Sequence, residues 1–163
     1  MFELIRPRVE LFGAWTAAHR EWGPGLHEDG FGISPDDDVE TAEGFGDWIE
    51  RVRKSPGNSW WVLDGGAVLG GIALRDADDE RVSRLGHVGY GIRPSARGRG
   101  AATWALGQVL LVAARFGVDP VIAVCRDDNP GSIATIEHHG AVLIAVEQHG
   151  AVHVRRYSIP VRR

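Results

Sequence analysis

The chain has 163 residues, 44% of them hydrophobic, and a formal net charge of −4. This length and apolar content suit one buried core, so we predict a single domain over residues 1–163. No apolar run reaches the roughly 20 residues that cross a bilayer, and residues 1–10 do not resemble a secretory signal. We therefore expect a cytoplasmic protein with no membrane contact. The acidic balance argues against nucleic acid as a ligand, and the lone Cys125 excludes an intramolecular disulfide and a zinc site built from several cysteines.

The first half of the chain predicts one strand, two helices and a long loop. Residues 2–7 have the pattern of a short strand, and residues 9–20 have apolar positions on one face of a helix. Residues 21–38 are rich in Gly, Pro and Asp and predict a loop that is long for a compact domain. Thr41 is expected to cap a helix that continues to about Lys54.

The second half of the chain predicts six strands and two more helices. A hairpin is expected over residues 60–74, with its turn at 64–66, followed by a strand over 85–92. A long apolar helix begins near Gly100, a strand covers 120–125, and a helix over 129–139 ends at Gly140. A final hairpin turns at residues 149–150. This order predicts an α+β (mixed α/β) fold with one sheet and helices on both of its faces.

A glycine-rich, arginine-bearing loop joins the strand that ends at Ile92 to the helix that begins near Gly100. Several backbone N–H groups meet at such a helix N-terminus, where the helix dipole also favours a negative charge, so we predict a phosphate-binding loop. Glycine for steric reasons alone is the alternative. The loop has neither the Gly-Lys-Ser/Thr of an ATP-binding P-loop nor the G-x-G-x-x-G spacing of dinucleotide sites, so ATP and NAD are not expected.

Two landmarks give the chain its resemblance to a known family. Residues 97–102, RGRGAA, match the R-x-x-G-x-G/A signature of the GNAT superfamily of acyl-CoA-dependent N-acyltransferases. Residues 127–141, DDNPGSIATIEHHGA, are similar to its second landmark, an N-x-x-S helix start followed by a closing glycine. The likeness is to a little-characterised bacterial branch. It implies a mostly antiparallel sheet of about seven strands, splayed between the fourth and fifth strands, with acetyl-CoA as acyl donor and no metal.

The resemblance also implies a set of cofactor-binding residues. The end of the fourth strand would bind pantetheine through its backbone, at Tyr90, Gly91, Ile92 and Arg93. The loop would bind the pyrophosphate through Arg97, Gly98, Arg99, Gly100, Ala101, Ala102 and Thr103. Asn129 would hydrogen-bond the cofactor arm, with Ser132 close to it. Asn129 followed by Pro130 is also a good helix start, and capping alone would explain it.

The chemistry that the family name implies is direct attack of an amine on the thioester, without an acyl-enzyme. Many relatives place a carboxylate near the position of His87 to accept the amine proton, and an imidazole with a pKa near 6.5 suits that role at neutral pH. A hydrogen-bonded core histidine is the alternative. Ile136 stands where many relatives have a tyrosine that protonates the thiolate, so that acid is missing.

The expected acceptor follows from the charge of residues 21–50, which contain ten acidic residues and no Lys or Arg. In the family this region forms one wall of the acceptor groove. We predict a small cationic amine, bound by Trp22, Phe31, Asp36, Asp37 and Asp38. A solvated acidic loop that serves solubility is the alternative. A catalytically degenerate acyl-CoA-binding regulatory module, a protein N-terminal acetyltransferase and a homodimer are left open.

Overall fold

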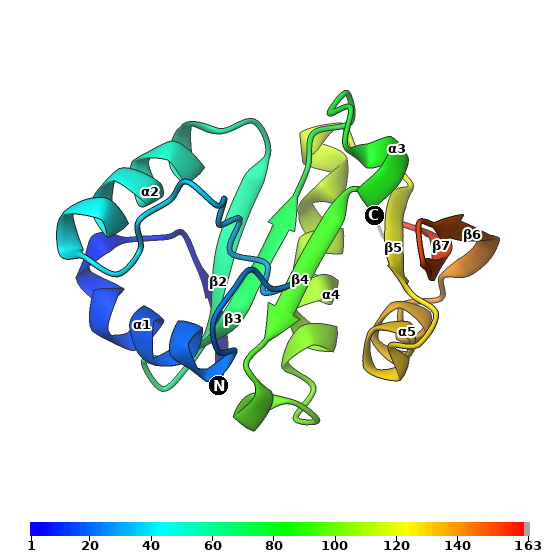
Figure 1. Cartoon of the computed structure of the whole chain (residues 1–163). Coiled ribbons are helices and arrows are strands. Elements are labelled where there is room, and N and C mark those ends of the chain that lie inside the picture. Colours follow the sequence, from blue (N-terminus) through cyan, green and yellow to red (C-terminus); the bar gives the residue numbers. More distant parts are fainter. Residues whose placement is uncertain (162–163) are drawn as a thin grey trace. The chain divides into compact units, whose positions relative to one another are not determined.

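The computed structural model describes residues 1–161, and it divides into two compact units. Unit 1 comprises Met1–Ala73 and Tyr90–Ala101, and unit 2 comprises Leu74–Gly89 together with the chain from Ala102 onward. Seven strands of the described chain form one sheet in the order β1-β2-β3-β4-β5-β7-β6 (Figure 1). The β1–β2, β5–β7 and β6–β7 pairs are antiparallel and the β4–β5 pair is parallel. The predicted α+β class with seven mostly antiparallel strands is confirmed; the expected splay between β4 and β5 stays a prediction.

Unit 1 contains the first two helices and the first three strands. Its elements are β1 (Phe2–Ile5), the 3-10 turn η1 (Val9–Leu11), α1 (Phe12–Glu21), α2 (Ala42–Lys54), β2 (Asn58–Asp64) and most of β3 (Ala67–Leu74), and it adds the end of β4 (Val88–Ile92) and η2 (Pro94–Ala96). The predicted cap of α2 is confirmed, because the Thr41 hydroxyl accepts a hydrogen bond from the Gly44 N–H at 3.1 Å.

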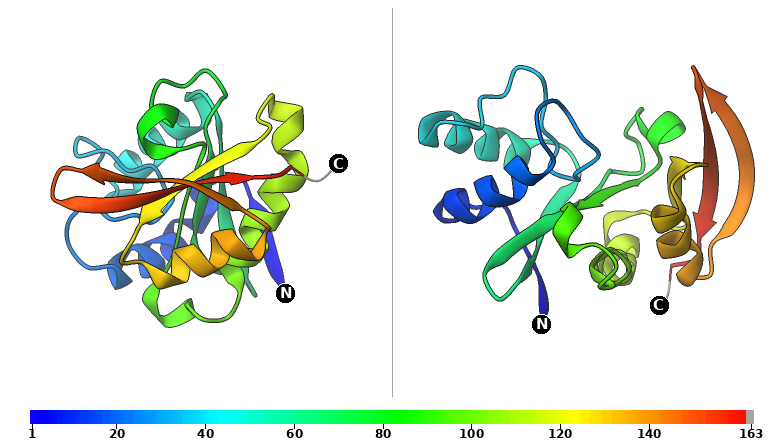
Figure 2. Two further views of the ribbon diagram at one scale, coloured as in Figure 1. Left: turned by 90° about the vertical axis from the view of Figure 1, so that its right-hand side faces the viewer. Right: turned by 60° about the horizontal axis from the view of Figure 1, so that its bottom comes forward.

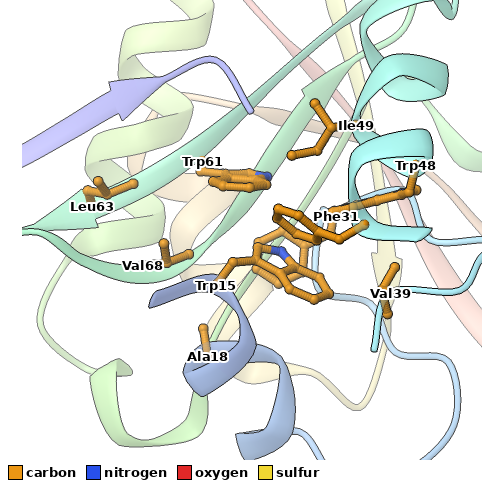
Figure 3. Close-up of a cluster of buried hydrophobic side chains, with 10 residues drawn as sticks. Trp15, Ala18, Phe31, Val39, Trp48, Ile49, Trp61, Leu63 and Val68 are labelled. Carbon is orange, nitrogen blue, oxygen red and sulfur yellow. The ribbon is translucent and has the colours of Figure 1, made fainter. Parts of the chain in front are cut away.

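An aromatic core holds the two helices of unit 1 against β2 and β3. The ring of Trp15 from α1 lies 4.9 Å from that of Trp48 on α2 and 5.4 Å from that of Phe31 in the connecting loop. Figure 3 shows these rings beside Trp61 of β2. Burial of such large apolar rings is the main force that folds a small domain, and it explains why both helices carry their aromatic residues on one face. Trp15, Trp48 and Trp61 are buried in this core, whereas Trp60 and Trp104 are only half-buried.

Unit 2 contains the rest of the chain. Its elements are α3 (Val82–Leu85), the start of β4, α4 (Ala101–Ala113, from Ala102 on), η3 (Ala114–Phe116), β5 (Val121–Arg126), α5 (Pro130–His138), β6 (Val142–His149) and β7 (Val152–Ile159). The hairpin of β6 and β7, orange to red in Figure 2, extends the sheet beyond β5. The four-residue helix α3 was not predicted, because so short a helix carries no periodic signal. No helix within residues 1–161 is long and apolar enough to cross a membrane.

Candidate active site

The predicted phosphate-binding loop has the backbone that its glycines require. Gly98 and Gly100 have positive φ angles of 73° and 82°, a conformation that side chains other than glycine strongly disfavour. A Cβ atom added at either position would meet no atom within 4 Å, so the loop faces open space there. Helix α4 begins at Ala101, directly after the second of these glycines. The local geometry therefore suits the approach of an anion, and phosphate binding itself stays a prediction.

The arginines around this loop already have protein partners. Arg97 Nε donates to the Ile92 carbonyl oxygen at 2.8 Å, and Arg99 donates to the Asp64 carboxylate at 2.9 Å. A guanidinium has five N–H donors, so each arginine keeps donors for a further acceptor. Because these side chains are held on the protein, the backbone N–H groups of the loop are the donors best placed for a first contact with phosphate.

The structure argues against the expected pantetheine contact of the Arg93 backbone. The Arg93 N–H donates to the Leu69 carbonyl at 2.7 Å, and the Arg93 carbonyl accepts from the Ala96 N–H at 3.0 Å. Both backbone groups are thus used inside unit 1, in the pairing with β3 and in the η2 turn. The Arg93 side chain is paired with Glu21. Tyr90, Gly91 and Ile92 remain the candidates on this strand.

His87 does not have the geometry of the predicted base. It lies one residue before β4, and its Nδ1 accepts a hydrogen bond from the Ile122 N–H at 2.8 Å. The neutral ring therefore carries its proton on Nε2 and has no lone pair left for an amine proton. Burial, followed by the nearby Arg75 charge, lowers the pKa of the His87 imidazole and keeps it neutral. The alternative of a hydrogen-bonded core histidine fits this structure better.

The first turn of α4 and the helix α5 are tied together inside unit 2. Asn129 is the N-cap of α5, and its Oδ1 accepts from the Ser132 N–H at 3.1 Å. Further along α5, the Thr135 hydroxyl lies 3.4 Å from that of Thr103, and the His139 ring contacts the Thr103 carbonyl at 2.8 Å. These contacts position the start of α4. Asn129 performs the capping role that was the alternative to cofactor binding, and the Asn129 amide nitrogen is not used by that cap.

The position of the missing tyrosine is occupied by a core residue. The Ile136 side chain is buried on α5, with an exposed fraction of 1%. The next residue, Glu137, accepts a hydrogen bond from the Tyr157 hydroxyl at 2.8 Å. Burial is the main cause that raises the pKa of Tyr157, so its hydroxyl stays protonated. Tyr157 lies on β7, and its hydroxyl is already used as the donor in this hydrogen bond to Glu137.

The acidic stretch of residues 21–50 is used mostly by unit 1 itself. Glu21 pairs with Arg93 and accepts from the Ser95 N–H at 2.6 Å. Asp37 pairs with Arg51, which lies just outside the stretch. The expected cation-attracting wall is thereby weakened, because bases from elsewhere in the chain neutralise part of its charge.

Three more of the predicted acceptor residues, in addition to Asp37, have structural contacts. Asp38 accepts hydrogen bonds from the Thr41 hydroxyl at 2.7 Å and from the Glu40 N–H at 3.0 Å, next to the start of α2. Phe31 is 1% exposed inside the aromatic core, so it cannot reach an acceptor without opening that core. The Trp22 ring packs edge-on against it at 5.6 Å. Asp36 is exposed, and its predicted contact with an acceptor stays a prediction.

Asp29 is a residue that the sequence reasoning did not single out. It is 4% exposed, and no other carboxylate in residues 1–161 is so deeply buried. Its backbone carbonyl accepts from the Gly71 N–H of β3 at 3.1 Å. The available signal was Gly30 directly after this acidic residue, because a glycine allows a loop to lie directly on a sheet. Within residues 1–161 there is no group of three or more His, Cys, Asp or Glu residues that could hold a metal ion.

Comparison with known proteins decides the family. Residues 8–142 match the model of the acetyltransferase (GNAT) domain. The chain belongs to the GNAT acetyltransferases. A sequence comparison with curated proteins finds no significant match.

Solved structures of other acetyltransferases share the fold of this chain. The putative acetyltransferase yncA from Salmonella typhimurium, solved with its cofactor acetyl-CoA, is 15% identical with a TM-score of 0.66, over 99% of this chain and 94% of that one. The microcin C7 self-immunity acetyltransferase MccE, in complex with acetyl-CoA and AMP, is 16% identical with a TM-score of 0.73, over 98% and 92%. A ribosomal-protein alanine acetyltransferase from Vibrio fischeri is 14% identical with a TM-score of 0.73, over 98% and 93%.

Proposed function

We propose that this GNAT domain transfers the acetyl group of acetyl-CoA to an amine by direct attack. The observation that carries the proposal is the loop over residues 97–103, where two left-handed glycines leave open space before a helix N-terminus. A diphosphate needs this combination of close backbone approach and convergent N–H donors. Membership of the GNAT family supports acetyl-CoA as the donor.

The reaction needs no covalent intermediate on the protein. Cys125, which stands alone as a cysteine in the sequence, is buried on β5 with an exposed fraction of 8%, and a small buried thiol is a poor nucleophile. In the direct reaction the amine nitrogen forms a bond to the acetyl carbon, the carbon–sulfur bond breaks, and coenzyme A leaves as its thiol. One proton is released from the acceptor ammonium to solvent.

The acceptor class is a finer part of the proposal. We favour a small cationic amine, because the buried Asp29 leaves one carboxylate of the acidic stretch without a cationic partner among residues 1–161. A protein N-terminus is the second candidate, since the Vibrio fischeri relative is named for a ribosomal protein. A regulatory module that binds acetyl-CoA without turnover is the third. The cytoplasmic location and the homodimer stay predictions.

Ligand-dependent thermal unfolding tests the donor. At a concentration a hundredfold above its dissociation constant, a ligand of the native state adds about 2.7 kcal/mol to the free energy of unfolding. We expect acetyl-CoA to raise the melting temperature and ATP and NAD to leave it unchanged. Gly100→Glu should abolish the shift, because it places bulk and negative charge at the loop. No shift with millimolar acetyl-CoA would overturn the proposal.

Thiol release from acetyl-CoA then separates the acceptor classes. The amines to compare are 1,4-diaminobutane, n-butylamine and a short peptide with a free N-terminus. Faster release with 1,4-diaminobutane or n-butylamine than with the peptide supports a small cationic acceptor. Preference for the peptide supports N-terminal acetylation. Binding of acetyl-CoA without release in the presence of any of these amines supports the regulatory module.

A further inference from the structure

The loop over residues 28–31 lies directly on the backbone of β3 and β4 within unit 1. A Cβ atom added at Gly91 of β4 would lie 2.2 Å from the Glu28 carbonyl oxygen and 2.6 Å from the Asp29 Cα. A Cβ atom added at Gly30 would lie 2.1 Å from the Gly71 carbonyl oxygen. Only glycines permit contacts this close. Asp29 is therefore held on the strand segment 90–92, the segment that the family resemblance assigns to the acyl-CoA arm.

The hydrogen bonds around Asp29 fix its orientation. Its carbonyl is bonded to β3, and its Oδ1 accepts from the Phe31 N–H at 2.9 Å. Phe31 itself is locked in the aromatic core. The carboxylate thus sits on a support that is rigid on both sides, as a group that must meet a reacting atom requires.

The charge of Asp29 is not balanced by an ion pair. No Lys, Arg or His nitrogen within residues 1–161 lies within 4.0 Å of its carboxylate. The groups that act on it electrostatically are His19 of α1 and His27 of its own loop. Desolvation by burial is the main cause that raises the pKa of the Asp29 carboxyl above its usual range. A buried charge without a partner is costly, and proteins keep such groups where they serve a function.

The His19 side chain, which acts electrostatically on Asp29, has a buried polar atom without a hydrogen bond in the described chain. His19 Nδ1 is enclosed without a hydrogen-bond partner in the described chain, and the His19 ring stacks on Trp15 with centroids 4.7 Å apart.

We propose that Asp29 is the catalytic base: it binds the ammonium group of the acceptor and takes up its proton. The step converts the ammonium and the carboxylate into an amine and a carboxylic acid. The amine nitrogen then attacks the acetyl carbon and the bond from that carbon to sulfur breaks. The nitrogen loses its second proton to the departing thiolate, so coenzyme A leaves as its thiol, and Asp29 returns the first proton to water. This inference rests on the proposed acetyl transfer, and it replaces His87, whose Nδ1 is used by the Ile122 N–H.

The variant Asp29→Asn tests the charge while it keeps the turn. An asparagine Oδ1 can still accept from the Phe31 N–H, and the side chain has nearly the same size. The matched control is Glu28→Gln, which removes the same charge from the exposed neighbouring residue. With 1,4-diaminobutane as acceptor we expect Asp29→Asn to lower kcat by roughly 10² to 10⁴ and to leave the affinity for acetyl-CoA unchanged. The decrease of kcat at acidic pH that the parent shows should be absent in this variant. Glu28→Gln should change kcat by less than threefold.

Stability gives a readout that does not depend on the acceptor. The pKa of Asp29 is higher in the folded than in the unfolded protein, so between these two pKa values the native state binds more protons. The free energy of unfolding therefore falls as the pH rises from the unfolded to the folded pKa. Asp29→Asn should therefore melt at or above the temperature of the parent at pH 7, and this difference should shrink towards pH 4. A lower melting temperature of Asp29→Asn at pH 7 would show that the negative charge itself stabilises the fold.

The outcomes separate this inference from the proposed function. No thermal shift with acetyl-CoA in the parent rejects acetyl transfer itself. If acetyl-CoA binds and the parent turns over, a loss of less than tenfold in Asp29→Asn rejects Asp29 as the base. A melting temperature that falls in Asp29→Asn, or a parent that binds acetyl-CoA but acetylates no amine of the panel, also overturns it.

Discussion

The imidazole of His87 joins the start of β4 to β5. The ring Nδ1 accepts from the Ile122 N–H, and the backbone N–H of His87 donates to the Ile122 carbonyl at 2.7 Å. We expect His87→Ala to lower the free energy of unfolding by about 1–3 kcal/mol, because a buried N–H loses its partner, and to lower kcat/KM by less than tenfold. Denaturant unfolding and thiol release measure the two effects.

The control for this prediction is His87→Asn, in which a side-chain oxygen can again accept from the Ile122 N–H. It should recover part of the lost stability. A hundredfold loss of turnover in a His87→Ala protein of unchanged stability would restore the imidazole to the chemistry.

The carboxylate of Glu21 makes stability depend on acid. Hydrogen bonds from Ser95 and Arg93 lower the pKa of Glu21 to about 2 from an ordinary value of 4.5. A lowered folded pKa stabilises the protein above the unfolded pKa, and this contribution is lost as the pH falls from about 4.5 to about 2. Glu21→Gln should lower the stability at pH 7 by roughly 1–2 kcal/mol.

Thermal unfolding from pH 7 to pH 2 checks this effect. The gap between the parent and Glu21→Gln should close across the acid window, whereas Glu3→Gln, an exposed change on β1, should follow the parent at every pH. A gap of constant size down to pH 2 would show that the charge of Glu21 is not the cause.

At the scale of elements, glycines decide how the loop between α1 and α2 meets β4. Gly91→Ala would force its Cβ against the Glu28 carbonyl, so the loop must move away from the strand. We expect a loss of about 1–3 kcal/mol in unfolding free energy, as for overpacked cores, together with a reduced rate of acetyl transfer. Chemical denaturation and thiol release measure both.

Gly13→Ala provides the matched control. Gly13 lies in α1, and an added Cβ there would meet no atom within 4 Å. The higher helix propensity of alanine should raise the free energy of unfolding of Gly13→Ala by about 0.5–1 kcal/mol, and its rate of acetyl transfer should not change. Equal stability in both variants would mean that the loop does not press on β4.

At the scale of the whole molecule, the strand β6 forms one edge of the sheet and exposes apolar side chains. Val142, Leu143, Ile144 and Val146 are 62%, 45%, 52% and 56% exposed. Edge strands without charged or proline residues at such positions tend to pair with other chains. We expect Ile144→Lys to lower concentration-dependent self-association, measured by sedimentation, and to leave acetyl-CoA binding unchanged.

Leu111→Lys is the control for that experiment, because Leu111 is 57% exposed on α4 and lies outside the strands. If both variants associate as the parent does, the edge of β6 is not a contact between copies of the chain.

The sequence by itself determined the order of the strands and of the longer helices, the cap of α2, and the glycine loop before α4. These features depend on neighbours a few residues apart: Thr41 caps the helix that begins with the next residue, and Gly98 and Gly100 set their own backbone angles. The two family landmarks are equally local. They were sufficient for the fold and for the family, which residues 8–142 confirm.

Only the tertiary structure decided which charged residues form pairs, and that the buried Asp29 carboxylate has no ion-pair partner among residues 1–161. The partners are distant in the chain: Glu21 and Arg93 are 72 residues apart, and His87 and Ile122 are 35 apart. A run of acids predicts a charged wall only if its charges stay unpaired, and that depends on packing. The role proposed for Asp29 arises in the same way, because burial beside β4 changes the chemistry of a carboxylate that in the sequence is one acid among ten.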